Sequence, residues 1–519
     1  MTDRLRIALA QLNPHPGAVA ANAASIRAAR AEAAAMGAAL LVTPHFSLGG
    51  APPGDLARVP AFIATCEATL AALAAETADG GPGLILGGPW AEGGRLFDAA
   101  FLLDGGRVLA RRARHLPPPD GVFDPGPAPG PVVFRDLRLG LMPGGDWRDP
   151  AVPETLAESG AEILLAVDAD PFTEGEPERR IDLAVARVVE TGLPFAFTSQ
   201  VGGQGDRVFD GGGFVLNADR SLALRQPMFA EAITPTDWAL GEDGWACAPQ
   251  PLPPAMPAPE QLWRALVLAL ADHVRRGGFS GVLLELAGDV DSALLAACAV
   301  DALGAARVRG LLLPSPGTGP ERLEDAAACA TLLGIKVENL PTAPALAGFQ
   351  AMLGEAGQVP DGRIRATALL ARAEASGALP LAGGNRSSLA LGHGEAWDGG
   401  YALLRDLWQT EVLDLARWRD AMQPVMPARL LERPSSPPDG LPPWQDLDLI
   451  LRELTAEAPD AARLLARGFE PATVTRVWRL LDRAGYKRRQ APPGVTLGRH
   501  AFGRERRYPL FHGFTDLVP

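Results

Sequence analysis

Apolar runs and alanine-rich stretches alternate along the first half of the chain. The short, nearly continuous apolar runs have the length of buried strands, and the first two are 6–12 and 40–43. The longer stretches 20–36 and 64–78 are rich in alanine and are predicted to be helices. Further strand-like runs lie at 83–86, 99–103, 139–142, 162–167 and 195–199. Strands that alternate with helices predict an α/β layer architecture.

The second half repeats this alternation with clearer helices. A helix is predicted at 260–276, followed by a buried strand at 281–286 and a helix that begins near Asp291. A second strand at 308–314 and a helix at 321–334 complete a β-α-β-α unit. Such a unit is typical of a doubly wound parallel sheet, because strand-helix-strand crossovers are right-handed and place helices on the sheet faces.

A proline-rich segment, 245–259, separates the two patterns. We therefore predict a first domain at 1–244, a linker at 245–259 and a second domain at 260–519. The length of 519 residues supports this division, because single hydrophobic cores rarely grow beyond about 250–300 residues.

Composition narrows the class of protein. The chain is 47% hydrophobic and 21% charged, which is typical of a globular protein. No stretch is expected to supply the roughly 20 apolar residues that cross a bilayer, and the first residues do not resemble a signal peptide. A net charge of -13 argues against a nucleic-acid partner, which would need clustered positive charge. We expect a cytoplasmic protein without membrane or nucleic-acid partners.

Cysteine and lysine usage limits the possible chemistry. The four cysteines are widely spaced, so neither a disulfide framework nor a metal site is predicted. Only two lysines occur, Lys336 and Lys487, and none lies in the first 335 residues. Because arginine does not deprotonate in proteins, any mechanism that needs a titrating amine in the first half is excluded.

One turn is a candidate phosphate-binding loop. Residues 287–292 (Ala-Gly-Asp-Val-Asp-Ser) follow a predicted strand and open a predicted helix. That placement aims backbone N–H groups and the positive end of the helix dipole at an anion. A glycine between strand and helix also occurs as plain turn chemistry, so the loop alone does not decide between the two.

Several motifs together carry a family resemblance. The turn resembles the Ser-Gly-Gly-X-Asp-Ser loop of the ATP pyrophosphatase superfamily, and it keeps Gly288, Asp291 and Ser292. Residues 384–390 resemble the Gly-Asn-Lys-Ser-Glu motif of NAD+ synthetases, and 486–494 resemble that family's Lys-Arg-Arg-Gln-X-Pro-Pro-Gly segment. In the first half, segments that resemble a nitrilase-like glutaminase domain occur in the family's order. They are 44–56, 116–124, 140–147 and 201–214. The chain is identified as a member of the glutamine-dependent NAD+ synthetase family.

The resemblance implies both a fold and a reaction. It implies an α/β protein with an N-terminal nitrilase-like α-β-β-α sandwich and a C-terminal doubly wound parallel-sheet domain of the ATP pyrophosphatase type. A Cys-Glu-Lys triad in the first domain of the family hydrolyses glutamine. The second domain uses ATP and Mg²⁺ to amidate nicotinic acid adenine dinucleotide with the ammonia. Family members associate, so a homo-oligomer, or a hetero-oligomer with an intact paralogue, is also expected.

This chain departs from the family at all three glutaminase positions. The positions that match the carboxylate, the lysine and the nucleophile hold His45, Ala113 and Gly144. His45 has no nucleophile to deprotonate. Arg112 or Arg114 could stabilise an oxyanion. The remaining cysteines of this half are expected in a helix, at Cys66, and in the linker, at Cys247. Hydrolysis of glutamine by the family mechanism is therefore not expected.

The synthetase positions are partly kept. We expect ATP contacts from Gly288, Asp291 and Ser292, and substrate contacts from Asn385, Arg386 and Lys487. Lys487 is equally interpretable as part of a packing or subunit-contact segment. Ala287 replaces a serine donor, and Asp289 is expected to repel a triphosphate. Arg386 replaces the lysine of the 384–390 motif, and Ser388 replaces its magnesium-binding glutamate, so binding of ATP and Mg²⁺ is expected to be weakened.

Three functional hypotheses follow. The first is a pseudoenzyme of the family with a structural or regulatory role, lacking glutaminase activity and with impaired or no synthetase activity. The second is an active NAD+ synthetase that uses free ammonia. The third is a module that senses a nucleotide without turning it over.

Overall fold

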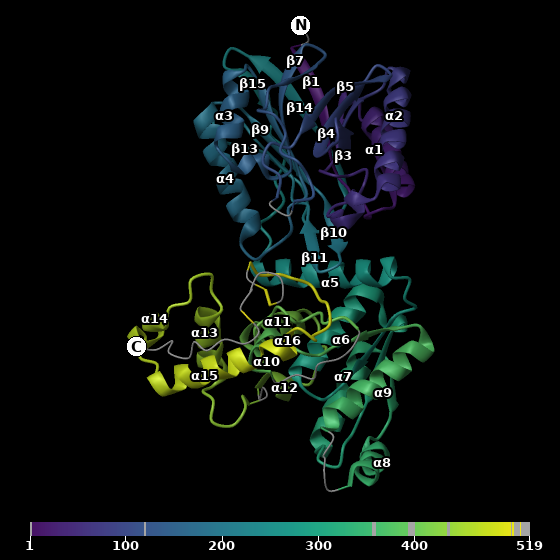
Figure 1. The fold of residues 1–519 in the computed structure, drawn as a ribbon, viewed down its shortest axis with the longest axis vertical. Coiled ribbons are helices and arrows are strands. Elements are labelled where there is room, and N and C mark those ends of the chain that lie inside the picture. Colours follow the sequence, from purple (N-terminus) through teal and green to yellow (C-terminus); the bar gives the residue numbers. More distant parts are fainter. Residues whose placement is uncertain are drawn as a thin grey trace. The chain divides into compact units, whose positions relative to one another are not determined.

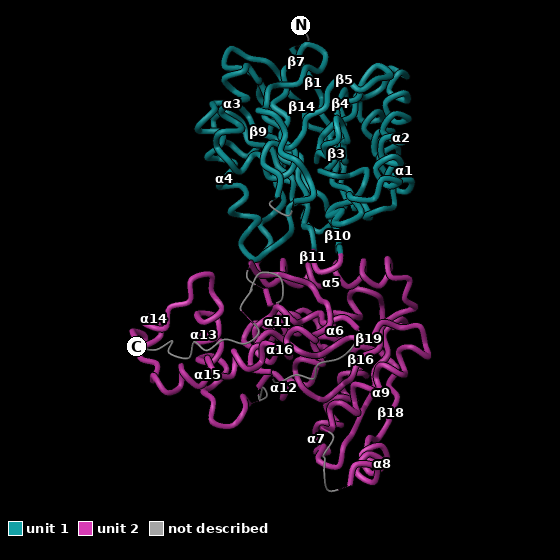
Figure 2. Tube along the Cα trace, viewed as in Figure 1, with its two compact units in different colours: residues 1–204, 208–256 teal, residues 205–207, 257–519 magenta. Residues whose placement is uncertain are grey.

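The computed structural model describes residues 3–118, 121–354, 360–392, 400–432, 436–499, 501–502 and 509. The chain folds into two compact units (Figure 2). Unit 1 comprises residues 1–204 and 208–256, and unit 2 comprises residues 205–207 and 257–519. The α/β fold class that the sequence predicts is confirmed in both.

The main division between the units, after residue 256, falls inside the linker 245–259 that the sequence suggested, but the first residues of that segment belong to a strand. Residues 245–247, placed at the start of the proline-rich linker, belong with Gly244 to strand β15 (Gly244–Cys247), which pairs with β14 (Ala232–Gly241). Trp245 and Cys247 are buried while the residues between them are exposed, which is the two-residue period of a strand. The prolines begin only after this strand, and α5 starts at Ala258.

Two sheets form the centre of unit 1. The first is seven-stranded, with strand order β15-β14-β1-β2-β3-β4-β5, and the second is six-stranded, with order β13-β12-β9-β8-β7-β6. Strands β10 and β11 form a separate hairpin. The bounds of the strands not yet given are β1 Arg4–Gln11, β2 Leu40–Val42, β3 Gly83–Glu92, β4 Arg95–Asp104, β5 Arg107–Ala113, β6 Val132–Phe134, β7 Leu137–Pro143, β8 Ile163–Asp168, β9 Phe195–Ser199, β10 Val201–Gln204, β11 Arg207–Asp210, β12 Phe214–Leu216 and β13 Leu222–Arg225.

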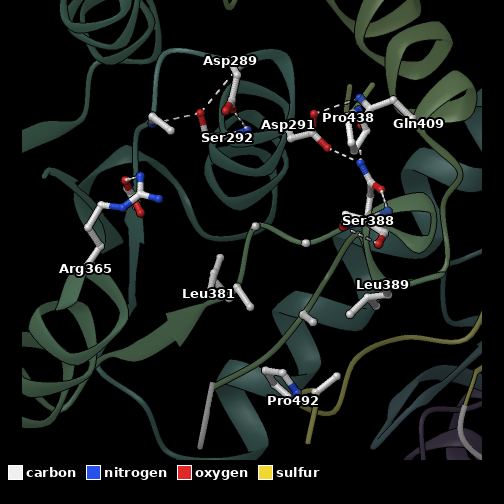
Figure 3. A pocket seen from close by; sticks show the side chains of 18 of the residues that line it. Asp289, Asp291, Ser292, Arg365, Leu381, Ser388, Leu389, Gln409, Pro438 and Pro492 are labelled. Carbon is white, nitrogen blue, oxygen red and sulfur yellow. Dashed lines mark hydrogen bonds and ion pairs between the residues drawn. The ribbon is translucent and has the colours of Figure 1, made fainter. Parts of the chain in front are cut away.

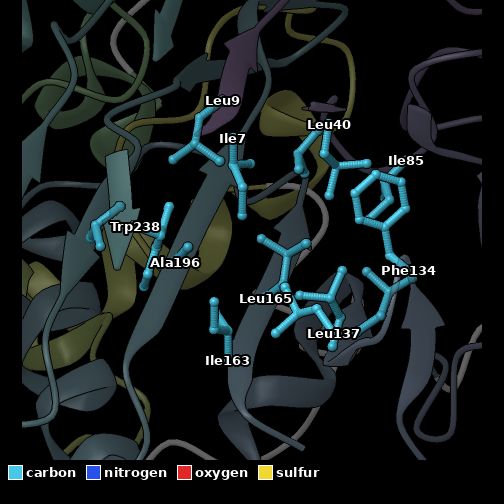
Figure 4. Packing of buried hydrophobic residues seen from close by; sticks show 14 of the residues in the cluster. Ile7, Leu9, Leu40, Ile85, Phe134, Leu137, Ile163, Leu165, Ala196 and Trp238 are labelled. Atoms are coloured by element: carbon cyan, nitrogen blue, oxygen red, sulfur yellow. The ribbon is translucent and has the colours of Figure 1, made fainter. Parts of the chain in front are cut away.

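The inner faces of the two sheets pack against each other. Ile7 and Leu9 of β1 point into this core, where they share a cluster with Ile163 and Leu165 of β8 (Figure 4). The alternate residues of β1 face the helices instead, as Ala8 does. Because both faces of the strand are buried, its sequence is a continuous apolar run rather than an alternating one.

Helices cover the outer faces of the sandwich (Figure 1). Helices α1 (Val19–Ala35) and α2 (Pro60–Glu76) pack on the seven-stranded sheet, and α3 (Ala151–Glu158) and α4 (Glu176–Thr191) pack on the other. The segment Pro60–Asp79 is long and apolar enough to cross a membrane by length and composition, contrary to the sequence expectation. Its apolar side chains join the core cluster beneath it, and a core helix of a soluble protein passes the same test.

Unit 2 contains a four-stranded parallel sheet with strand order β18-β17-β16-β19. The chain passes from β16 outward to β18 and then returns to the opposite side of β16 with β19, so the order reverses between β16 and β19. Ligands in open α/β sheets bind at the carboxyl ends of strands at such a reversal. The elements are β16 Val282–Glu285, α6 Val290–Leu303, β17 Val308–Leu312, α7 Pro320–Leu333, β18 Lys336–Asn339, α8 Ala343–Leu353, α9 Asp361–Ser376 and β19 Leu379–Leu381.

A helical layer follows the sheet. Some of its helices contribute to a separate apolar cluster that includes Trp408 and Trp478. The helices of this layer are α10 Arg386–Leu391, α11 Gln409–Met422, α12 Ala428–Glu432, α13 Trp444–Leu454, α14 Ala461–Ala466, α15 Pro471–Arg483 and α16 Gly485–Arg488. Helix α10 is the next helix after β19. It begins close to the carboxyl end of that strand, where a ligand is expected.

Candidate functional sites

A buried polar cluster occupies the position of the predicted glutaminase site. His45 follows β2, Asp98 lies in β4 and Arg114 follows β5. The His45 Nε2 atom lies 2.9 Å from both carboxylate oxygens of Asp98, and both side chains are almost fully buried. Arg114 Nη1 lies 3.5 Å from Asp98 Oδ2. The carboxylate therefore joins a histidine to a guanidinium in the interior of unit 1.

A side chain at the position that matches the nucleophile would displace the guanidinium of Arg114. Gly144 follows β7 in a left-handed conformation, with φ of +57°. A Cβ atom built there would lie 2.8 Å from Cζ and Nη1 of Arg114. The guanidinium of Arg114 therefore fills the space beside the backbone of Gly144.

Asp146 supplies a second carboxylate near the same guanidinium. Its carboxylate accepts hydrogen bonds from the backbone N–H groups of His115 and Leu116, at 2.7 and 2.9 Å, and lies 3.9 Å from Arg114 Nε. Burial raises the pKa of Asp146, and burial lowers the pKa of Arg112. Ala113, at the lysine position, is buried at the end of β5. The carboxylates of Asp98 and Asp146 therefore lie near the guanidinium of Arg114. Arg114 is one of the two arginines that the sequence offers for stabilising an oxyanion.

The thiols of this half lie elsewhere. Cys66 is a buried residue of α2, as predicted, and Cys247, in β15 rather than in a linker, packs in the core between the two sheets. Burial raises the pKa of each thiol to about 12. Because the thiolate is the nucleophilic form, neither cysteine is suited to attack an amide.

A cavity of about 500 Å³ lies at the carboxyl ends of β16 and β19, at the reversal in strand order (Figure 3). Its polar wall comes from the turn after β16, from the start of α10 and from α11. Its apolar wall includes Leu381, Leu389, Pro438, Trp444 and Pro492. The predicted residues Asp291, Ser292 and Asn385 line this cavity together.

Asp291 is the centre of an amide network. Its two carboxylate oxygens accept hydrogen bonds from Asn385 Nδ2 at 2.5 Å and from Gln409 Nε2 at 2.9 Å. The Asn385 amide also donates to Gln409 Oε1 at 2.6 Å. Burial raises the pKa of Asp291 to about 6, and the neighbouring Asp289 carboxylate adds to the shift. The side-chain amides of Asn385 and Gln409 are therefore both engaged in hydrogen bonds to Asp291.

Asp289 caps the N-terminus of helix α6, a role that was not predicted from the sequence. Its Oδ1 atom accepts a hydrogen bond from the backbone N–H of Ser292 at 3.0 Å, and its Oδ2 atom lies 3.1 Å from Arg322 Nη2. Gly288 has a left-handed backbone conformation, and close packing also requires a glycine at this position. A Cβ at this position would lie 2.0 Å from the backbone oxygen of Arg322.

Of the three residues predicted to contact substrate, Asn385 lines the cavity, whereas Arg386 and Lys487 do not. Asn385 faces the cavity and caps α10 by accepting from the Ser388 N–H at 2.9 Å. Arg386 does not line the cavity: it is buried, lies 3.1 Å from Asp406 and stacks over Trp408. Lys487 also lies outside the lining and donates to the Gly392 carbonyl at 2.9 Å.

The carboxylates around the cavity fit a magnesium ion poorly. Mg²⁺ is usually held by one or two carboxylates whose oxygens are available to it. Asp289 and Asp291 accept hydrogen bonds from protein donors, and Glu285 lies 2.9 Å from Arg365 Nη1. Among the described residues, no group of three or more His, Cys, Asp or Glu is arranged to hold a metal ion.

Two residues that organise these sites, Asp98 and Gln409, were not predicted from the sequence. Asp98 is a lone acidic residue within the apolar run of β4, and that isolation was an available signal. Gln409 was not among the predicted site residues, yet it donates a hydrogen bond to Asp291. Nothing in the local sequence around Gln409 indicates that partner, which is 118 residues away.

Comparisons with known proteins agree with both units. The carbon-nitrogen hydrolase family matches residues 6–238, and the NAD synthase family matches residues 262–491. The chain is 38% identical to the glutamine-dependent NAD(+) synthetase of Rhodobacter capsulatus, over 99% of this chain and 100% of that protein. It is 33% identical to the enzyme of the same name from Synechocystis sp., over 98% and 99%.

A solved structure gives the same result for the fold. The glutamine-dependent NAD+ synthetase of Acinetobacter baumannii in complex with ADP matches with a TM-score of 0.79 and 29% identity, over 98% of both chains. Because the Rhodobacter capsulatus relative is 38% identical over almost the whole length of both chains, the chain belongs to the glutamine-dependent NAD+ synthetase family.

Proposed function

We propose that this protein is a pseudoenzyme of the glutamine-dependent NAD+ synthetase family. It does not hydrolyse glutamine, its synthetase activity is impaired or absent, and it serves a structural or regulatory role. The observation that carries the proposal is the guanidinium of Arg114, which fills the space beside Gly144 where the family's nucleophile would project.

The chemistry of amide hydrolysis supports the first part. A thiolate must attack the carboxamide, a base must take its proton, and a fixed cation or donor must stabilise the oxyanion. Unit 1 offers a cation in Arg114, but it is held by Asp98 and Asp146, and both cysteines of the unit lie in apolar cores. Neither cysteine thiol of unit 1 is therefore placed to form the covalent intermediate.

The pairing of charged groups supports the second part. Adenylation of a carboxylate by ATP needs free donors and a magnesium ion to neutralise the triphosphate. The carboxylates at the cavity accept hydrogen bonds or form ion pairs within the chain, and Arg322 and Arg365 are paired with two of them. Binding of Mg²⁺ and ATP therefore competes with interactions already made.

The full-length chain tests the proposal directly. It is incubated with nicotinic acid adenine dinucleotide, ATP and Mg²⁺, with either glutamine or ammonium chloride as nitrogen source, and NAD+ is measured. The Rhodobacter capsulatus relative serves as the positive control. We expect no NAD+ above background with either source. Production from glutamine would overturn the proposal, and production from ammonia alone would establish the ammonia-dependent enzyme instead.

A nucleotide-sensing role is the second candidate, and the cavity of about 500 Å³ favours it. Ligand pockets commonly have this size and combine apolar walls with a few polar groups. The ADP-bound relative indicates an adenine nucleotide or a part of one as the ligand class. Stabilisation by ligand without turnover would support this role.

The structural or regulatory role implies that the chain associates with a second copy of itself or with an active paralogue. Light scattering of the chain alone, and after co-expression with the paralogue, measures this association.

A further inference from the structure

The carboxylate of Asp289 engages two groups that would otherwise bind a phosphate. A helix N-terminus and a nearby guanidinium are the usual recognition elements for phosphate oxygens. Here Asp289 accepts the N–H of Ser292 at the start of α6 with one oxygen and pairs with Arg322 through the other. The loop thus carries its own anion.

The charge around the cavity opposes a polyphosphate chain. The charged side chains that line it are three carboxylates, from Glu285, Asp289 and Asp291, and two guanidinium groups, from Arg322 and Arg365. Both guanidinium groups are already paired with carboxylates of the lining. A triphosphate would bring several further negative charges within a few ångströms of these groups, where like charges repel strongly.

The rest of the lining suits an uncharged ligand with a flat apolar part. Leu381, Leu389 and Pro492 line one part of the cavity (Figure 3), and Pro438 and Trp444 are further apolar residues of the lining. Such a surface accommodates a planar ring, and the hydroxyl groups of Ser292 and Ser388 belong to the same lining, where a ligand's hydroxyl groups can meet them.

We propose that the cavity of unit 2 takes a neutral nucleoside, and that Asp289, clamped by Arg322, excludes the corresponding nucleoside triphosphate. The inference rests on the proposed function, since it specifies which part of the family's nucleotide this chain still accepts. Asp289 is then a specificity-determining residue as well as a helix cap.

Calorimetric titration of the full chain with adenosine and with ATP, each with and without Mg²⁺ at constant ionic strength, tests the inference. We expect adenosine to bind at least tenfold more tightly than ATP, which corresponds to 1.4 kcal/mol. In Asp289→Asn, which keeps a capping oxygen but removes the charge, ATP affinity should rise at least tenfold while adenosine affinity stays within about twofold. Asp414→Asn removes an equal charge from an exposed position of α11 and should change neither affinity.

A double variant checks the clamp. In Asp289→Asn the guanidinium of Arg322 is released toward the ligand, so adding Arg322→Gln should cancel the gain in ATP affinity. Circular dichroism and the thermal midpoint confirm that each variant is folded. The inference is overturned if the unmodified chain binds ATP as tightly as adenosine, if it binds no adenosine, or if Asp289→Asn gains no ATP affinity. ATP binding without NAD+ formation would defeat this inference alone, whereas NAD+ formation would also defeat the proposed function.

Discussion

Restoring a thiol at the lost nucleophile position would not restore glutamine hydrolysis. In Gly144→Cys the new Cβ would lie 2.8 Å from the Arg114 guanidinium, so that side chain must move away. The φ of +57° at this position adds about 1–2 kcal/mol for a residue with a Cβ atom. Moving Arg114 also weakens its ion pairs with Asp98 and Asp146, and at 3.5 and 3.9 Å we assign that loss roughly 1 kcal/mol.

The two contributions sum to about 2–3 kcal/mol of unfolding free energy. For a domain of this size, such a loss lowers the thermal midpoint by roughly 4–12 °C. Calorimetry measures the midpoint, and release of glutamate from glutamine measures the activity, for which we expect no signal because no partner base has been restored.

The neighbouring glycine provides a matched control. A Cβ at Gly145 would lie 2.9 Å from Arg114 Nη2, but its φ is not in the left-handed region. Gly145→Cys should therefore cost about 1–2 kcal/mol less than Gly144→Cys. Equal stability of the two variants would refute the geometric argument, and glutamine hydrolysis by Gly144→Cys would refute the chemical one.

Three further predictions follow from the buried charges. Asp98→Asn leaves His45 and Arg114 without their carboxylate and should cost about 3 kcal/mol in urea unfolding; a loss under ~1 kcal/mol would contradict a structural role for the cluster. The pKa of Asp291 is raised to about 6, so its contribution to stability is full below about pH 4 and falls by up to roughly 3 kcal/mol as the pH rises through 6; in Asp291→Asn this part of the thermal-midpoint pH profile should be flat. Arg386→Ala should cost about 3–5 kcal/mol because it strips a buried ion pair, whereas Lys487→Ala should stay within about 0.5 kcal/mol; the reverse order in urea unfolding would show that Arg386 is not a structural residue.

The fold could largely be predicted from the sequence because its signals are local. Apolar runs of strand length and helical periodicity placed β1, β2, β16 and β17 within two residues of their observed bounds. The proline-rich segment contains the main division between the units, and β15 was not predicted because a four-residue strand beside prolines carries little local signal. The loop at 287–292 was also placed correctly between strand and helix.

The sequence by itself determined which atoms are missing: no lysine in the first 335 residues and no cysteine at residue 144. Only the tertiary structure decided what the remaining residues do. Arg114 beside Gly144, Asp289 on Arg322 and Gln409 on Asp291 are partners separated by 30 to 118 residues. Their pairing depends on which strand ends the sheet brings together and on the directions of the side chains, and neither is encoded in local periodicity.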